Sequence, residues 1–224
     1  MPVRPVALIV GMAAGLGQSL VQAFVDAGYD VVGIARSPGT VGLAYRHLSC
    51  DVTDLVQLEA QLGPIAPDVE VVVYNAQHLV IAAFDEITPA TFEQVWRVAC
   101  FGAMAVARIV LPHMVARRRG TLIFTGATAS RRGGAKFAAF ASAKFALRGL
   151  AQALAREYGP KGVHVAHVVV DGLIWAPQTE RRFNPEQAAC IEPDEVAKTY
   201  LGLVGQHSSA WTQELDLRPM GEQF

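Results

Sequence analysis

Short apolar runs alternate with longer amphipathic stretches along the chain. Seven runs have the length and side-chain composition of β-strands: residues 6–10, 29–35, 45–49, 69–74, 120–125, 163–170 and 210–217. The first is apolar throughout, as expected of a strand that is covered on both faces. Helical spacing of apolar residues is found over residues 15–27, 89–116, 137–158 and 193–204. After Pro177 the chain turns polar until the last of these helices begins.

The order of these elements indicates the fold class. Strands that alternate with helices predict a parallel sheet with helices on both of its faces. We therefore expect an α/β fold with a doubly wound parallel sheet of about seven strands. No internal repeat, low-complexity tract or linker divides the sequence. Residues 1–224 are accordingly expected to form one domain, which is long enough to bury a full core.

Composition narrows the possible partners. Hydrophobic residues make up 52% of the chain and charged residues 17%, which indicates a well-packed globule. A formal charge of −1 provides no field that would attract nucleic acid or an anionic membrane. Cys50, Cys100 and Cys190 are far apart in sequence, so neither a disulfide framework nor a metal site is predicted. The apolar run near the N-terminus is too short for a signal peptide or a membrane span, so we expect a cytoplasmic protein.

A glycine-rich loop follows the first predicted strand. Gly11, Gly15 and Gly17 form a GxxxGxG pattern just before a predicted helix. Such a turn exposes backbone N–H groups and a helix N-terminus to a pyrophosphate. Glycine clusters also occur in ordinary strand–helix turns, so the loop alone leaves both interpretations open.

A second motif opens the helix at residues 137–158, where the sequence reads Phe140-Ala141-Ser142-Ala143-Lys144. Together with the glycine loop it resembles the short-chain dehydrogenase/reductase family, whose motifs are a TGxxxGxG loop and a YxxxK helix. The resemblance covers nearly the whole chain and implies a Rossmann fold that binds a nicotinamide cofactor. Two positions depart from the pattern, since Val10 replaces the threonine and Phe140 replaces the tyrosine.

The resemblance also implies which residues contact the cofactor. These residues lie in the glycine loop, at the ends of the next three strands, on the long helix and after the sixth strand. They are Gly11, Ala14, Gly15, Leu16, Gly17, Arg36, Ser37, Asp51, Val52, Asn75, Ala76, Gln77, Lys144, Gly172 and Ile174.

The end of the second strand bears on the choice of cofactor. A carboxylate there usually binds the ribose 2′-hydroxyl of NAD, whereas a 2′-phosphate needs a cation. Ala35 supplies no carboxylate, while Arg36 offers a planar fork suited to phosphate and Ser37 a hydroxyl. We therefore expect NADP(H) rather than NAD(H), with a solvated surface arginine as the alternative. For Asp51 the alternative to an adenine contact is a helix N-terminal carboxylate near Thr53.

The catalytic positions implied by the resemblance are largely replaced. Ala127 stands where the family has a serine, Ala99 where it has an asparagine and Phe140 where it has a tyrosine, so only Lys144 is retained. Loss of a positioned acid typically costs about 10²–10⁴ in rate. Ordinary ketone reduction is therefore expected to be severely impaired.

Lys144 and the residues around the predicted cleft leave several roles open. Lys144 lies one helical turn from Phe140, from where it would reach the nicotinamide ribose, or act as a proton donor if desolvation lowers its pKa. Its alternative role is that of a surface lysine. His78 either points at the nicotinamide end of the cleft or belongs to a surface loop. Arg131 and Arg132, between the fifth strand and the long helix, are candidates to meet an acidic substrate.

Two function classes follow. The first is an NADP(H)-dependent oxidoreductase that reduces a small carbonyl-, imine- or alkene-type substrate with a non-standard active site. The second is an NADP(H)-binding pseudoenzyme that acts as a sensor or partner subunit. Apolar residues on more than one face of the long helices, such as Phe101, Met104, Phe145 and Leu150, indicate a homodimer or homotetramer.

Overall fold

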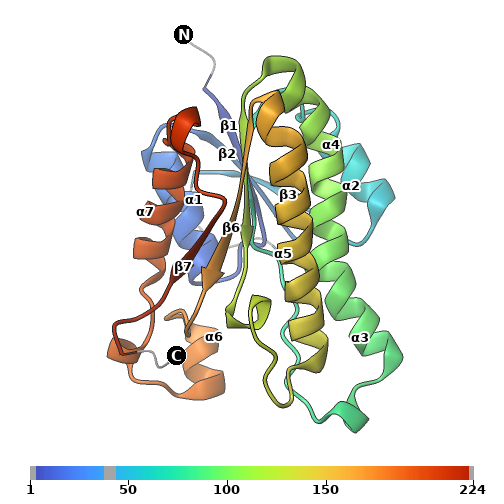
Figure 1. Ribbon diagram of the computed structural model, residues 1–224, viewed down its shortest axis with the longest axis vertical. Helices are drawn as coiled ribbons and strands as arrows, with labels where there is room; N and C mark the ends of the chain where they lie inside the picture. Colours follow the sequence, from blue (N-terminus) through green and yellow to red (C-terminus); the bar gives the residue numbers. More distant parts are fainter. Residues whose placement is uncertain (1–3, 38–43, 222–224) are drawn as a thin grey trace.

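A seven-stranded parallel sheet forms the centre of the protein (Figure 1). The computed structural model describes residues 4–37 and 44–221. The strands pair in the order β3-β2-β1-β4-β5-β6-β7, and every pair is parallel. Their bounds are β1 Val6–Val10, β2 Asp30–Ala35, β3 Arg46–Ser49, β4 Val69–Tyr74, β5 Gly120–Thr125, β6 Val163–Val170 and β7 Glu214–Leu217.

Helices cover both faces of this sheet, as Figure 1 shows. One face is covered by α1 (Leu16–Asp26) and α7 (Pro193–Val204), which pack on each other. The other face is covered by α2 (Leu55–Leu62), α4 (Gly102–Arg117) and α5 (Ala138–Tyr158). Successive residues of β1 pack on opposite faces of the sheet, since Leu8 belongs to one buried cluster and Ile9 to the other. The predicted doubly wound α/β fold is thereby confirmed.

The long helix predicted over residues 89–116 is present but not uniform. It consists of α3 (Pro89–Trp96), a π-helical segment (Arg97–Phe101) and α4. The Tyr74 hydroxyl donates a 2.5 Å hydrogen bond to the Val98 carbonyl oxygen inside the π-helical segment. Of the described helices, this composite (Pro89–Arg117) alone is long and apolar enough to cross a membrane. More than half of its most apolar window is buried within the protein, which accounts for its apolar character by packing.

The structure differs from the elements predicted from the sequence in three places. The last strand begins at Glu214 rather than at residue 210, because Ser208–Ala210 forms a 3₁₀ turn. Two helices went unpredicted, α2 and the short α6 (Pro177–Phe183). The signal for α2 was Asp54, whose side chain accepts a hydrogen bond from the Gln57 N–H and caps the helix. In α6 the polar composition concealed a helix that begins with proline at its first position.

The topology gathers the segments that follow six of the strands at one edge of the sheet. Chain connections run from β1 outward to β3, and then return to β4 on the opposite side of β1. In open parallel sheets, ligands bind outside the carboxyl ends of the strands at this reversal. The segments that follow β1, β2, β3, β4, β5 and β6 all meet there.

Candidate active site

A cleft of about 1180 Å³ lies along the carboxyl edge of the sheet. Its described walls come from the glycine loop, from the segments that follow β2 to β6, and from α6. Most of the predicted site residues line it: Gly11, Ala14, Leu16, Gly17, Arg36, Ser37, Asp51, Val52, Asn75, Ala76, Gln77, His78, Ala127, Phe140, Gly172 and Ile174. The residues predicted to contact the cofactor and the substrate are therefore brought together by the fold.

Close backbone packing requires glycine in the loop after β1. Gly11 has a φ of +92°, and a Cβ there would lie 2.6 Å from the Ala76 nitrogen. The Asn75 side-chain amide donates a 2.9 Å hydrogen bond to the Gly11 carbonyl oxygen, which ties the loop to the end of β4. At Gly17, a Cβ would meet the Met12 Cα at 2.6 Å. The loop is thus held directly over the N-terminus of α1.

Gly15, which was expected to contact the cofactor, packs against Ala176. It precedes α1 with a φ of +90°, and a Cβ there would lie 2.7 Å from the Ala176 Cβ. Gly15 is outside the described lining of the cleft. Its lack of a side chain therefore also lets the segment that leads into α6 approach the glycine loop. The Gln178 side chain of α6 adds a hydrogen bond to the Ala14 carbonyl oxygen.

The end of β2 forms one end of the cleft. Arg36 and Ser37 are exposed there, and Asp51 lies opposite, after β3. Partial burial acts to raise the pKa of Asp51, but hydrogen bonds from the Thr53 N–H and hydroxyl, with the positive charges of Arg36 and Arg97, hold it below its usual value. Asp51 thus carries a full negative charge near neutral pH. The helix cap considered for it belongs instead to Asp54.

At the centre of the cleft, the positions expected to hold catalytic hydroxyls and amide are apolar and packed together. Phe140, which is 6% exposed, and the fully buried Ala99 share one buried cluster. We call it the Phe140 cluster: its buried members are Val95, Ala99, Ala129, Ala139, Phe140, Ala141 and Ala143, with Leu79, Val80, Ile87, Phe92, Ala127 and Phe137 packed against them. Phe140 and Ala127 face the cleft, whereas Ala99 lies behind it. These three side chains provide no hydrogen-bond donor.

Lys144 is enclosed behind this cluster. Its side chain is completely buried, and it is not among the described residues that line the cleft. The ammonium group donates a 2.8 Å hydrogen bond to the carbonyl oxygen of Thr125, the last residue of β5. Burial lowers the pKa of Lys144 to about 7. The idea of a surface lysine is therefore wrong, while the ribose contact stays a prediction.

The segment after β6 closes the cleft from the other side. Gly172 has a φ of +151° and packs against Pro219, and Ile174 follows it into the cleft wall. Arg182 of α6 also lines the cleft and donates a 3.4 Å hydrogen bond to the Leu79 carbonyl oxygen. Sequence reasoning missed α6 and its contribution because the polar stretch carried no motif.

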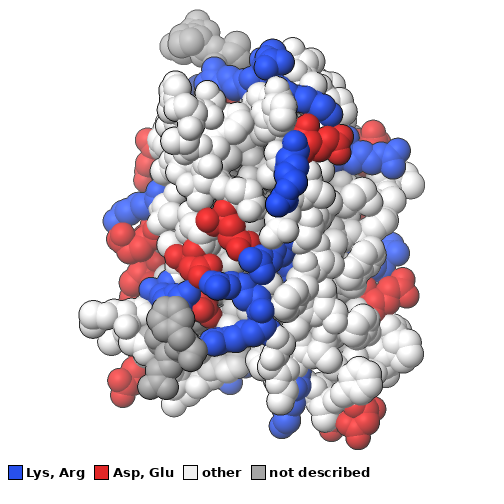
Figure 2. All heavy atoms as spheres, viewed as in Figure 1, with Lys and Arg blue, Asp and Glu red and all other residues white. Residues whose placement is uncertain are grey.

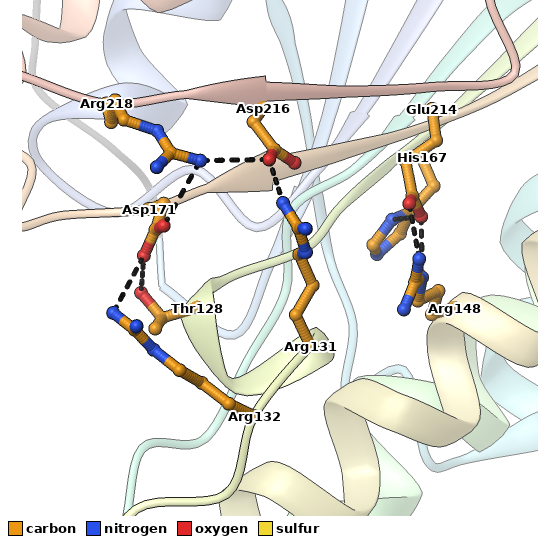
Figure 3. A network of polar contacts seen from close by, with 9 residues as sticks. All are labelled: Thr128, Arg131, Arg132, Arg148, His167, Asp171, Glu214, Asp216 and Arg218. Carbon is orange, nitrogen blue, oxygen red and sulfur yellow. Dashed lines mark hydrogen bonds and ion pairs between the residues drawn. The ribbon is translucent and has the colours of Figure 1, made fainter. Parts of the chain in front are cut away.

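The two arginines after β5 have different surroundings. Arg131 forms an ion pair with Asp216 of β7 (Figure 3), and Arg132, but not Arg131, is among the described residues that line the cleft. Arg148 of α5 donates two hydrogen bonds to Glu214 of β7, and these bonds join the helix to the sheet. Among the described residues, no group of three or more His, Cys, Asp or Glu side chains is arranged to hold a metal ion.

Comparison with known proteins gives consistent matches. A family model described as short chain dehydrogenase matches residues 5–184. Galactitol 2-dehydrogenase from Agrobacterium fabrum is 33% identical over 184 residues, which cover 76% of this chain and 72% of that protein. A crystal structure of a short-chain dehydrogenase from Rhodopseudomonas palustris is 31% identical, with a TM-score of 0.80 over 97% of this chain and 100% of that one. A metagenomic short-chain oxidoreductase crystallised with NADP has the same fold, with 24% identity and a TM-score of 0.81 over 97% of this chain and 98% of that one.

Proposed function

The chain belongs to the short-chain dehydrogenase family, and on this premise we propose that it is an NADP(H)-binding oxidoreductase with a non-standard active site. Its substrate in this proposal is a small molecule with a carbonyl, imine or activated alkene. The observation that carries the proposal is that one cleft joins a glycine loop, a cation at the end of β2 and an apolar reaction centre. The related galactitol 2-dehydrogenase supports an oxidoreductase by its name.

The residues of the cleft fit a dinucleotide phosphate. The glycine loop leaves a space that a Cβ at Gly11 or Gly17 would disrupt, and the N-terminus of α1 follows it with N–H groups directed outward. At the end of β2, the exposed Arg36 meets the requirement of a 2′-phosphate, and Ala35 supplies no carboxylate that would repel it. When bound, the cofactor would supply or accept a hydride.

The chain's own residues set what the reaction centre can do. Phe140 and Ala127 exclude water and shape the cleft, but they neither polarise a carbonyl oxygen nor deliver a proton to it. Lys144 fixes the end of β5 through the Thr125 carbonyl oxygen, beside Ala127. This arrangement favours substrates that accept a hydride without protonation of a carbonyl oxygen by the protein, such as an iminium ion, over simple ketones.

The same cluster supports a second candidate function. A cleft that binds NADP(H) but holds neither a proton donor nor an oxyanion donor at Phe140 and Ala127 also suits a sensor or partner subunit without redox turnover. The two candidates differ in one measurement. NADPH oxidation should be followed with ketones, imines and activated alkenes, and NADPH binding should be measured by its fluorescence on the same sample. Turnover with an imine or alkene supports the oxidoreductase, whereas binding without any turnover supports the pseudoenzyme.

A further inference from the structure

The cleft carries more positive than negative charge among its described residues. Its cationic side chains are Arg36, Arg132 and Arg182, whereas Asp51 is the one described lining residue with a carboxylate. Arg36 and Asp51 interact electrostatically at the β2 end of the cleft. The other two arginines, Arg132 and Arg182, line the cleft together with residues of the Phe140 cluster.

Arg132 is attached to the segment that carries Ala127. The Thr128 hydroxyl, next to Ala127, donates a 2.5 Å hydrogen bond to Asp171 Oδ1. Arg132 Nη2 lies 4.0 Å from the same oxygen atom. Since this separation exceeds a hydrogen-bond distance, the Arg132 guanidinium is held loosely and keeps donors available for another acceptor.

Arg132 belongs to a network of ion pairs. Figure 3 shows two carboxylates, Asp171 and Asp216, among three guanidinium groups. Arg218 lies 3.5 Å from Asp171 and 2.9 Å from Asp216, and Arg131 also pairs with Asp216. Of these guanidinium groups, Arg132 is the one that lines the cleft, and its contact with Asp171 is the longest of the four ion pairs.

Arg182 approaches the reaction centre from the opposite wall. Its Nη1 donates to the carbonyl oxygen of Leu79, and Leu79 packs against the Phe140 cluster. The guanidinium also stands 5.5 Å from the centre of the Phe183 ring. No carboxylate pairs with Arg182 among the residues that the structure describes. On the face that Figure 2 shows, by contrast, many basic side chains lie close to acidic ones.

We propose that the substrate carries a carboxylate, and that Arg132 and Arg182 bind it beside the Phe140 cluster. A guanidinium presents paired N–H donors that match the two oxygens of a carboxylate, and such charge-assisted bonds are among the strong ones. The inference rests on the proposed function in that it places the substrate in the same cleft. It narrows the substrate class to oxo acids and their imine or alkene counterparts.

Matched pairs of an acid and its neutral ester test this inference directly. Binding of pyruvate, levulinate and 5-oxohexanoate, and of the three methyl esters, should be measured by calorimetry on the full chain saturated with NADP⁺. At least one acid is expected to bind roughly 10-fold more tightly than its ester, as a charge-assisted hydrogen bond provides. Arg132→Gln and Arg182→Gln should each remove most of that preference and leave ester and NADP⁺ binding within about twofold of the parent.

Two neighbouring arginines serve as controls. Arg131→Gln alters the same loop, and Arg181→Gln the same helix, but neither residue lines the cleft, so the preference for the acid should remain. Equal affinity for acid and ester in all pairs would overturn the inference. So would an Arg182→Gln variant that loses NADP⁺ as strongly as the acid, because the arginine would then serve the cofactor. A retained acid preference without NADPH oxidation by any ketone, imine or activated alkene refutes the oxidoreductase while the carboxylate site stands.

Discussion

The ammonium nitrogen of Lys144 lies 5.5 Å from the centre of the Phe140 ring. The two residues are one turn apart on α5, and the ring separates the ammonium group from the cleft. Phe140 offers no hydroxyl, and the ammonium group donates its hydrogen bond to a backbone acceptor, the Thr125 carbonyl oxygen. The lysine of the motif is thus retained in an environment that disfavours its charge.

This burial predicts an unusual dependence of stability on pH. The pKa of Lys144 is lowered from 10.5 to about 7 in the folded protein. Between these values the unfolded chain binds more protons than the folded one, so stability rises with pH. Below about pH 7, Lys144 is protonated in both the folded and the unfolded chain, and the cost of burying its charge is then paid in full by the folded state. A pKa shift of this size corresponds to a loss of roughly 4–5 kcal/mol in the free energy of unfolding at low pH, compared with a pH above 10.5.

Urea unfolding of the parent and of Lys144→Met from pH 6 to 10.5 measures this effect. The free energy of unfolding of the parent should rise relative to that of the variant across the interval. Groups other than Lys144 cancel in the comparison. A constant difference at all pH values would show that the buried amine does not titrate in this range.

Arg36 should decide the preference between the two nicotinamide cofactors. A charge-assisted bond to the 2′-phosphate is expected to make NADPH bind about 10-fold or more tightly than NADH. Arg36→Ala should weaken NADPH and leave NADH nearly unchanged. Fluorescence titrations of both cofactors on both proteins provide the measurement. Equal affinities in the parent would assign Arg36 to the solvated surface.

A comparison of alanine substitutions at Gly11 and Gly28 distinguishes the cost of a steric clash from the cost of backbone strain. Both have positive φ, +92° and +88°, but a Cβ at Gly28 meets nothing within 4 Å. Gly28→Ala should therefore cost only the conformational term, about 1 kcal/mol. Gly11→Ala should cost clearly more and should abolish NADPH binding, because the new methyl group collides with Ala76. Thermal unfolding and cofactor titration of both variants decide this, and similar losses in the two would contradict it.

The outer face of α5 predicts self-association. Phe145 on α5 is 43% exposed and Trp96 at the end of α3 is 38% exposed. A homodimer or homotetramer would cover such side chains. Light scattering at micromolar concentration should report an oligomer, and Phe145→Asp should shift it toward the monomer. A parent that is monomeric under these conditions would refute the prediction.

Much of the fold could be predicted because buried strands have a local sequence that consists mainly of apolar residues. The run at β1 is apolar throughout, those at β4 and β6 are rich in valine, and the structure buries nearly every residue in all three. The parallel topology then brings the residues after each strand to one edge, so motifs far apart in sequence come to line one cleft. Most of the site residues named from the sequence therefore line the cleft, while their contacts with a cofactor stay predictions.

The remaining features depend on contacts that no local pattern records. The enclosure of Lys144 results from packing by Phe140 and from an acceptor on a different element, Thr125. The difference between Arg131 and Arg132 depends on Asp216, which lies at the far end of the chain. Likewise, α6 is a polar helix that is positioned by bonds to Ala14 and Leu79, so its role in the cleft became visible only in three dimensions.

The central claim is that this family member keeps its cofactor site but lacks the groups that donate a proton and polarise a carbonyl. Restoring those groups tests it. In Phe140→Tyr with Ala127→Ser, the new hydroxyls would be placed beside Lys144 and at the cleft wall. An unpaired hydroxyl could cost ~1–3 kcal/mol of stability, which the fold should tolerate.

The decisive measurement is NADPH oxidation with a panel of simple ketones, including oxo acids, by the parent and the double variant, with NADPH affinity determined on each. We expect the double variant to reduce at least one ketone measurably faster than the parent while NADPH affinity stays nearly constant. If the variant binds NADPH as before and reduces no ketone, the cleft differs from the family's reaction centre beyond these two positions, and the account is contradicted.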